Sequence, residues 1–194
     1  MPKALITSIL LLLTACSQVP PRPTAPVDTY PDVAIETSLG IFVGQLGRER
    51  APLSVENFLH YVQTGFYNDT NFYQVVPGFV IQGGDYTAAY GEKKTAAPIP
   101  NESGNGLSNL RGTIAVARNS APHTATAAFY INLVDNKKLD PRSDRWGYAV
   151  IGRVVQGMAV VDTIAAVPTG KVGPFDKNAP VTMLKVLVLP QPTN

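Results

Sequence analysis

The sequence predicts a mainly β domain, folded as a closed barrel whose ends are covered by two helices. Short apolar segments separated by turn residues recur from residue 33 to residue 189, as is typical of strands. Two other segments, 52–64 and 157–167, repeat their apolar residues at helical spacing. About eight strands and two helices result, and closing that many strands into a barrel leaves no exposed sheet edge.

The first two strands are expected at residues 33–38 and 41–46. The Leu39-Gly40 pair between them is typical of a tight hairpin turn. We therefore expect these strands to pair with each other.

The first helix is expected over residues 52–64. Its apolar residues recur at i, i+3, i+4 and i+7, namely Val55, Phe58, Leu59 and Val62. Ser54 is placed to cap the start of this helix, and Gly65 comes directly after its end.

The rest of the barrel is expected from six later segments and a second helix. The later strands are predicted at 71–76, 79–83, 113–118, 128–133, 148–154 and 181–189. The second helix is predicted over 157–167, where the apolar residues are Val160, Val161, Ile164 and Ala165.

Residues 1–15 are typical of an export signal. Lys3 precedes the apolar stretch from Ala4 to Leu13, which is too short to cross the ~30 Å hydrocarbon core of a membrane as a helix. A buried N-terminal helix is the alternative. The Leu-Thr-Ala-Cys sequence that ends at Cys16 resembles the bacterial lipobox, which implies that Cys16 is lipidated. Cys16 is the only cysteine, so no disulfide forms within the chain.

Residues 16–32 are predicted to be the lipidated cysteine followed by a proline-rich tether, which at ~3.1 Å per residue holds the next domain off a membrane. The domain is expected over 33–190, with a short tail at 191–194. Ser17 stands where an aspartate often retains a lipoprotein at the inner membrane, so the resemblance favours the outer membrane, facing the periplasm. Only the lipid is expected to contact the membrane.

Charge and motifs exclude several function classes. The 16 Lys and Arg residues nearly balance 14 Asp and Glu residues, without the basic stripe that nucleic acid requires. The sequence has no Gly-x-Gly-x-x-Gly motif, phosphate loop, Cys-x-x-Cys motif or metal-spaced histidine pair. Asp135, Asp140 and Asp144 lack the pattern of a calcium loop. We expect a monomer with no metal and no cofactor.

Four segments carry a family resemblance, in order along the chain: FYQVVPGFVIQGGDYT, NESGNGLSNLRGTIAVAR, TATAAFYINLVDNKKLD and WGYAVIGRVVQGM. With them the chain resembles the cyclophilin family, most closely its bacterial periplasmic branch, over nearly all of residues 33–189. The resemblance implies an eight-stranded antiparallel barrel capped by two helices. It also implies peptidyl-prolyl cis-trans isomerase activity on proline-containing polypeptides, without a cofactor.

The same resemblance implies a site. A proline pocket would be lined by Phe79, Val80 and Tyr130, with Leu139 beside them and Phe129 packed behind. Gln82 would hydrogen-bond the substrate backbone, and Ala117 would expose its main chain to an extended peptide. Tyr148 stands where a histidine is frequent, and periplasmic relatives accept tyrosine there.

The chain departs from the family at the catalytic end of this site. The family usually reads Phe-His-Arg where this chain reads Phe72-Tyr73-Gln74, so Gln74 replaces the catalytic arginine. A neutral amide forms weaker hydrogen bonds than a guanidinium, and a loss of ~2–3 kcal/mol would slow catalysis roughly 30 to 200 times. Ala128 replaces a glutamine, and Lys138 replaces an aromatic residue at the rim.

Two outcomes of this substitution stay open. Gln74 can still donate an amide hydrogen, and Arg118, on an adjacent strand, could supply a substitute charge; alternatively, Arg118 pairs away from the site. The function is accordingly either a prolyl isomerase of envelope proteins, with a reduced rate, or a non-catalytic chaperone or scaffold that binds proline-containing peptides.

Overall fold

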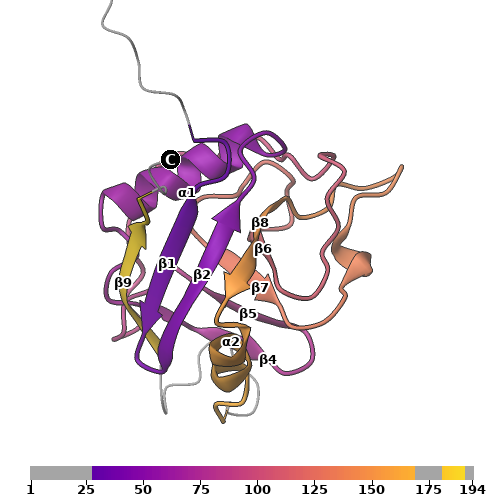
Figure 1. The fold of residues 1–194 in the computed structure, drawn as a ribbon. Helices are drawn as coiled ribbons and strands as arrows, with labels where there is room; N and C mark the ends of the chain where they lie inside the picture. The colour runs from indigo at the N-terminus through magenta and orange to yellow at the C-terminus, as the bar shows by residue number, and fades with distance from the viewer. Residues whose placement is uncertain (1–27, 169–180, 191–194) are drawn as a thin grey trace, which may run out of the picture.

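The computed structural model describes residues 28–168 and 181–190 (Figure 1). The predicted signal peptide at 1–15, the lipidation site Cys16, most of the tether and the tail at 191–194 lie outside the described residues. At the end of the predicted tether, Thr29 and Pro31 already accept backbone hydrogen bonds from Arg48 and Leu46. Ordered pairing with the domain thus begins a few residues before residue 33.

The described residues form one antiparallel sheet that curls into a nearly closed barrel. Its nine strands follow the order β3-β9-β1-β2-β8-β6-β7-β5-β4. The bounds are β1 Asp32–Thr37, β2 Gly40–Leu46, β3 Thr70–Phe72, β4 Gln74–Val76, β5 Val80–Gly83, β6 Thr113–Val116, β7 Phe129–Asn132, β8 Val150–Gln156 and β9 Val181–Val188. The mainly β barrel predicted from the sequence is confirmed.

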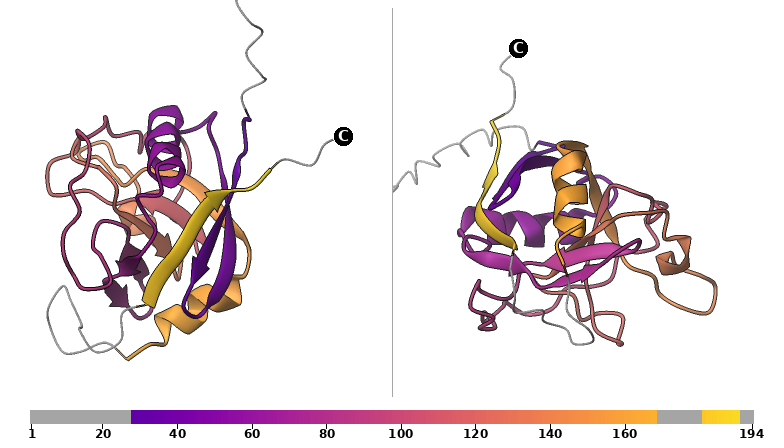
Figure 2. Two further views of the ribbon diagram at one scale, coloured as in Figure 1. Left: turned by 90° about the vertical axis from the view of Figure 1, so that its left-hand side faces the viewer. Right: turned by 90° about the horizontal axis from the view of Figure 1, so that it is seen from below.

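Two helices cover the ends of the barrel. They are α1, Pro52–Gln63, and α2, Met158–Ala165, and a short 3-10 helix, η1, spans Lys137–Leu139. Figures 1 and 2 show α1 and α2 at opposite ends of the barrel. No helix among the described residues has the length and apolar character to cross a membrane.

The barrel interior is built by alternation along the strands. On β7, Phe129 and Ile131 join the main core, whereas Tyr130 belongs to a separate cluster outside it. This is the period-2 pattern of a strand, in which successive side chains point to opposite faces of the sheet. The rings of Phe129 and Phe58 of α1 meet edge-on, with centroids 5.3 Å apart, so the helix packs directly against the core side chains inside the barrel.

The structure has nine strands where the sequence predicts about eight. The predicted strand 71–76 is interrupted at Tyr73: β3 pairs with β9, and β4 pairs with β5. Gly83 at the end of β5 lies so close to β3 that an added Cβ would stand 2.2 Å from the carbonyl oxygen of Asn71. One continuous strand thus becomes two at the corner where the barrel closes.

The cap of α1 differs from the prediction. Ser54 lies inside the helix, fully buried, and makes no capping hydrogen bond; the N-cap is Ala51. The first backbone N–H groups are instead satisfied by Glu102, whose carboxylate accepts from Leu53 at 3.1 Å and from Ser54 at 2.7 Å. A carboxylate suits this position because the helix dipole places partial positive charge there. The predicted Ser54 cap is wrong because a distant side chain occupies the capping position.

The other elements lie close to their predicted ranges. The β1–β2 hairpin is confirmed, with Thr37 paired to Gly40 across the turn. Between β4 and β5, Phe79 donates its N–H to Val76 at 3.0 Å, and Gly78 has φ 68°. A Pro-Gly turn of this kind requires positive φ at its third position, which glycine adopts without strain.

Candidate functional site

A row of side chains crosses the outer face of the barrel. The strand register places Gln74 opposite Gln82, Gln82 opposite Tyr130, Tyr130 opposite Ala115, and Ala115 opposite Val150. Residues opposite each other in antiparallel strands share a face. The catalytic residues predicted from the sequence, Gln74 and Gln82, are therefore brought together beside Tyr130.

An apolar cluster covers the middle of this outer face. We call it the outer cluster; it is separate from the barrel core. Its buried members are Val80, Ala115, Ala117, Ala128, Tyr130 and Val150, and its partly buried members are Phe79, Leu107, Leu139 and Tyr148. Of the residues that the sequence predicts for the proline pocket and its edge, it contains Phe79, Val80, Ala117, Tyr130, Leu139 and Tyr148, but not Arg118, Phe129 or Lys138. Phe129 belongs to the core behind the cluster, as expected from its packing role.

A network of hydrogen bonds among buried asparagines holds the aromatic residues of the outer cluster in place. The hydroxyl of Tyr130 donates to Oδ1 of Asn109 at 2.7 Å. Asn136 donates to the Phe79 carbonyl at 2.9 Å and to Oδ1 of Asn132 at 2.8 Å. Asn132 in turn donates to Oδ1 of Asn109 at 3.2 Å. Because these polar groups are hydrogen-bonded to one another, the bonds offset the cost of desolvating them and hold the rings of the site in place.

Asp140 connects this network to η1. Its carboxylate accepts from the Asn109 backbone N–H at 2.8 Å, from the Asn109 amide at 2.9 Å and from the Ser108 hydroxyl. Partial burial by itself raises the pKa of Asp140, but these hydrogen bonds and the Lys137 charge together lower that pKa below its ordinary value. Asn109, Asn132 and Asn136 were not predicted from the sequence, where the available signal was their polar character within or beside apolar strands.

A polar pocket of about 360 Å³ adjoins the outer cluster. Ala117 and Ala128 belong to both, and Gln82 lines the pocket as well. Gln82 donates its Nε2 to the Tyr73 hydroxyl at 2.8 Å. Burial raises the pKa of the Tyr73 phenol well above its usual range. Burial is also the largest cause that raises the pKa of the neighbouring Asp85 carboxyl, to which Tyr73 is hydrogen-bonded.

This chain of hydrogen bonds fixes one side of the Gln82 amide. Its carbonyl oxygen and its second N–H have no hydrogen-bond partner among residues 28–168 and 181–190. The same holds for the Gln74 side chain, which is half-buried. Both amides can therefore donate to a ligand on the outer face.

The guanidinium of Arg118 is engaged in shaping the loops beside the site. Its Nε donates to the Gly147 carbonyl at 3.0 Å, and its terminal nitrogens donate to the carbonyls of Asn119, Ser120 and Trp146. Its charge lies over the Tyr148 ring, 4.5 Å from the centroid. Arg118 lines the polar pocket, but these four hydrogen bonds argue against the alternative in which it replaces the missing catalytic cation. The alternative, that Arg118 pairs elsewhere, agrees with this geometry.

Lys138 supplies a second cation at the rim. Its ammonium lies 4.5 Å from the centroid of the Phe79 ring. Among the described residues, the ion pairs are Arg48–Glu56 and Arg111–Asp162, so Lys138 has no carboxylate partner there. The Phe79 ring is thus covered on one side by an exposed positive charge.

Metal ligands are not gathered at this site. Within residues 28–168 and 181–190, no three His, Cys, Asp or Glu side chains lie close enough to hold a metal ion. The arrangement offers instead an apolar cluster, two neutral amides and two flanking cations.

Comparisons with known proteins point to one family. Residues 32–187 match the family model described as "Cyclophilin type peptidyl-prolyl cis-trans isomerase/CLD". The chain is 44% identical over 182 residues to peptidyl-prolyl cis-trans isomerase A of Dickeya dadantii (strain 3937), with 93% of each chain covered. It is 48% identical over 144 residues to peptidyl-prolyl cis-trans isomerase B of Escherichia coli (strain K12), covering 73% of this chain and 88% of the relative.

Solved structures support the same fold. A cyclophilin type peptidyl-prolyl cis-trans isomerase of Cryptosporidium parvum aligns with a TM-score of 0.71 and 22% identity, covering 84% of this chain and 99% of that one. The same protein solved in the presence of the dipeptide Ala-Pro aligns with a TM-score of 0.70 and 23% identity, covering 82% of this chain and 99% of that one.

Proposed function

The chain belongs to the cyclophilin-type peptidyl-prolyl cis-trans isomerase family, and from this membership we propose that it isomerises X-Pro bonds of envelope proteins during their folding. We propose further that Gln74 makes it a slow member of that family. The observation that carries this proposal is the row on the outer face, in which Gln74 and Gln82 stand beside the apolar outer cluster.

The reaction requires little chemistry from the protein. Rotation about an X-Pro bond breaks no covalent bond and crosses a barrier of ~18–20 kcal/mol, which amide resonance creates. An apolar surface that holds the proline ring suits Phe79, Tyr130 and Leu139, which belong to the outer cluster. A donor aimed at the prolyl nitrogen accelerates rotation, because the nitrogen lone pair becomes available only as the bond twists.

The two amides have different roles in this proposal. Gln82 is held by Tyr73 at 2.8 Å, so it is oriented to bond the substrate main chain. Gln74, directly across from it, donates toward the prolyl nitrogen. As an uncharged donor, Gln74 stabilises the twisted amide less than a guanidinium does. The engagement of Arg118 with four carbonyls supports a reduced rate, because it leaves that cation unavailable for substitution.

The test replaces Gln74 by arginine and follows isomerisation of a short proline-containing peptide. We expect measurable activity in the unmodified protein and an increase of about 30- to 200-fold in kcat/KM in Gln74→Arg, equivalent to ~2–3 kcal/mol. Gln82→Ala is expected to abolish most activity in both backgrounds. Arg118→Ala tests whether the Arg118 charge substitutes for the missing catalytic cation. We expect any loss of isomerase activity in this variant to come from disorder of the loops that Arg118 holds, rather than from a loss of charge at the rotating bond.

A second function is favoured by one specific observation. The expected cation is absent at Gln74 while the outer cluster is complete, as in a module that binds proline-containing peptides without turning them over. A rate in the unmodified protein equal to that in buffer, together with peptide binding and recovery in Gln74→Arg, would replace the enzyme by this chaperone or scaffold.

Location is part of the proposal. We propose that the chain is a lipoprotein of the outer membrane, facing the periplasm, with Cys16 as its lipidated residue and its tether between lipid and barrel. The Leu-Thr-Ala-Cys sequence and the following Ser17 support this. Cys16→Ser is expected to release the protein from the membrane fraction of cells that express it; unchanged membrane association would contradict the proposal.

A further inference from the structure

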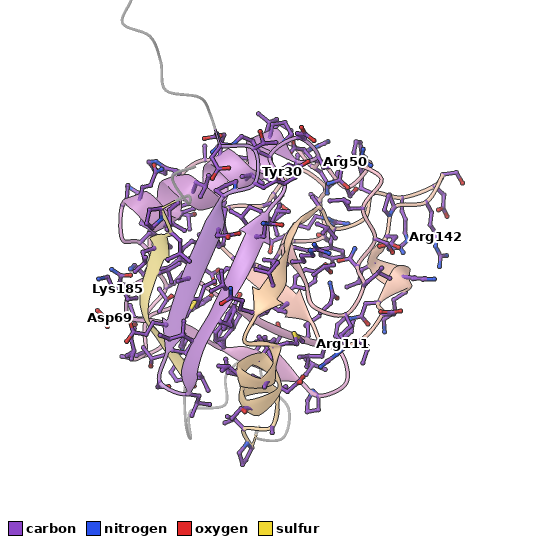
Figure 3. The ribbon with its side chains drawn as sticks, viewed as in Figure 1. Tyr30, Arg50, Asp69, Arg111, Arg142 and Lys185 are labelled. Carbon is purple, nitrogen blue, oxygen red and sulfur yellow. The ribbon has the colours of Figure 1, made fainter. Side chains whose placement is uncertain are left out.

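A second pocket opens on the same outer face as the proposed isomerase site. We call it the apolar pocket; its volume is about 530 Å³. Its apolar walls come from Leu107, Leu110 and Val150, and Leu46, which also lines it, belongs to the barrel core. Tyr30, Arg50 and Arg153 contribute to its rim, and Figure 3 shows the first two close to the same end of the barrel.

The apolar pocket is continuous with the outer cluster. Leu107 and Val150 belong to both, and Asn105 fastens the loop that carries Leu107 by donating to the Val150 carbonyl at 2.9 Å. The strand register extends this continuity, because Arg153 pairs with Thr113 on one side and with Gln45 on the other. The proposed isomerase site and the apolar pocket therefore lie on one sheet face, on either side of Leu107.

The apolar pocket is exposed and positively charged. Leu110 is 39% exposed and Tyr30 is 48% exposed, although both are large and mostly apolar. None of the lining residues is acidic, and within the described part of the chain neither Arg50 nor Arg153 belongs to an ion pair. Glu49 accepts the Tyr30 hydroxyl at 2.7 Å without lining the pocket. An apolar floor beside two guanidinium groups matches an apolar side chain that neighbours a carboxylate.

We propose that the apolar pocket is a second subsite for the same client polypeptide. It binds an apolar residue next to an acidic one, on a stretch of chain that flanks the isomerised proline. This inference rests on the proposed function of the outer cluster. Tethered to the proline site, the second contact forms at high effective concentration, so burial of one large apolar side chain tightens binding by about tenfold or more.

The experiment compares peptides that share one central Ala-Ala-Pro-Phe sequence. Each is extended on one side of the proline by twelve residues, either of Gly and Ser alone or with Leu-Glu pairs among them. Twelve residues span up to about 40 Å when extended, enough to cross a domain of this size. Binding to the full chain is measured by fluorescence anisotropy, and kcat/KM is measured with the unextended peptide.

We expect the Leu-Glu extension on one side of the proline to bind about tenfold tighter than its Gly-Ser counterpart. Leu110→Asp is expected to remove this gain without changing kcat/KM for the short peptide. Leu184→Asp is the matched control, because Leu184 is 46% exposed on β9 and does not line the apolar pocket. Arg153→Ala is expected to lower the gain for a Leu-Glu extension but not for a Leu-Gln extension.

Three results would overturn the inference. The first is equal affinity for Leu-Glu and Gly-Ser extensions on both sides, and the second is a gain that survives Leu110→Asp. The third is a concentration-dependent dimer, seen by sedimentation and lost in Leu110→Asp, because it would assign the pocket to a second copy of this chain. Failure of the catalytic proposal is distinguishable, since it removes turnover of the short peptide and leaves the anisotropy comparison intact.

Discussion

At the scale of single residues, the charge around the proposed isomerase site is unusually placed. The two residues that face each other at its catalytic end, Gln74 and Gln82, are neutral. The cations stand at the flanks, with Arg118 over the Tyr148 ring and Lys138 over the Phe79 ring. We expect charge at the flanks to act on residues next to the proline rather than on the rotating bond, and so to influence which peptides bind.

Lys138 leads to a prediction about substrate choice. Its ammonium has no carboxylate partner among the described residues, so a peptide with glutamate beside the proline gains an attraction worth about 1 kcal/mol at 4 Å in water. We expect kcat/KM for such peptides to exceed that for matched lysine peptides about threefold to tenfold. Lys138→Ala is expected to bring the ratio near one, as measured with the paired peptides at low salt.

The residue next to Lys138, Lys137, provides the control for the Lys138→Ala experiment. Lys137 is exposed on the same 3-10 helix, but it is Lys138 whose ammonium lies over the Phe79 ring, so Lys137→Ala should preserve most of the ratio. High salt should lower the ratio in the unmodified protein and in Lys137→Ala, because exposed charges are screened beyond ~3 Å at 1 M ionic strength. A ratio that is unchanged by Lys138→Ala would contradict this role.

The family resemblance predicted which residues would line the site, but not which residues would support them. Phe79, Val80 and Gln82 were predicted from the resemblance of the segment FYQVVPGFVIQGGDYT to the cyclophilin family, and the structure places all three on the turn and strand around β5. The role of Asn109 could not be predicted in this way. Its partners Tyr130 and Asp140 lie 21 and 31 residues away, so only the folded chain brings them together.

At the scale of elements, Asp140 at the C-terminal end of η1 is one of the residues that hold this helix to the barrel. The folded state lowers the pKa of this carboxyl, so the ionised form is the one that folding favours. Such a group adds stability above the ordinary pKa of an aspartate and loses that contribution as pH falls through its folded pKa. The stabilisation from Asp140 is therefore present at neutral pH and disappears in acid.

Replacing Asp140 by asparagine tests this contribution. Because the carboxylate is partly exposed to solvent, we expect a loss of only about 1 kcal/mol, which lowers Tm at pH 7 by about 2–4 °C. The difference from the unmodified protein should shrink as pH falls below about 4. Asp144→Asn, in the exposed loop after η1, is the control and should change Tm little. A Tm difference that is constant from pH 7 to pH 2.5 would rule out this explanation.

Sequence patterns predicted those helices and strands correctly whose formation depends on residues close together in the chain. The helical periodicity of residues 52–64 and the Leu39-Gly40 turn both lead to elements within a residue or two of the observed bounds. The start of α1 was predicted incorrectly because Glu102, 48 residues beyond Ser54, satisfies its N–H groups. The break at Tyr73 was missed because residues 71–76 read as one apolar strand, although its two halves pair with different partners.

At the scale of the whole molecule, the outer face of the barrel is organised as one strip. The outer cluster shares Ala117 and Ala128 with the polar pocket, and it shares Leu107 and Val150 with the apolar pocket. Each connection depends on the register of β5, β7, β6 and β8. A sequence pattern predicts which residues face outward, but the order of strands in the sheet decides which of them become neighbours.

Closure of the barrel yields the last prediction. Gly83 approaches β3 so closely that an added Cβ would stand 2.2 Å from the Asn71 carbonyl oxygen and 2.9 Å from the Phe72 Cα. Both are backbone atoms, so a methyl group there must force β3 and β5 apart. Gly83→Ala should therefore lower the free energy of unfolding by about 3 kcal/mol or more and lower Tm by at least ~6 °C.

Gly104→Ala is the matched control, because an added Cβ there meets nothing within 4 Å. Thermal unfolding followed by circular dichroism measures both, and equal Tm values for the two variants would show that this corner does not depend on close approach. Because Gln82 directly precedes Gly83, the folded fraction of Gly83→Ala should also lose isomerase activity, whereas Gly104→Ala keeps it.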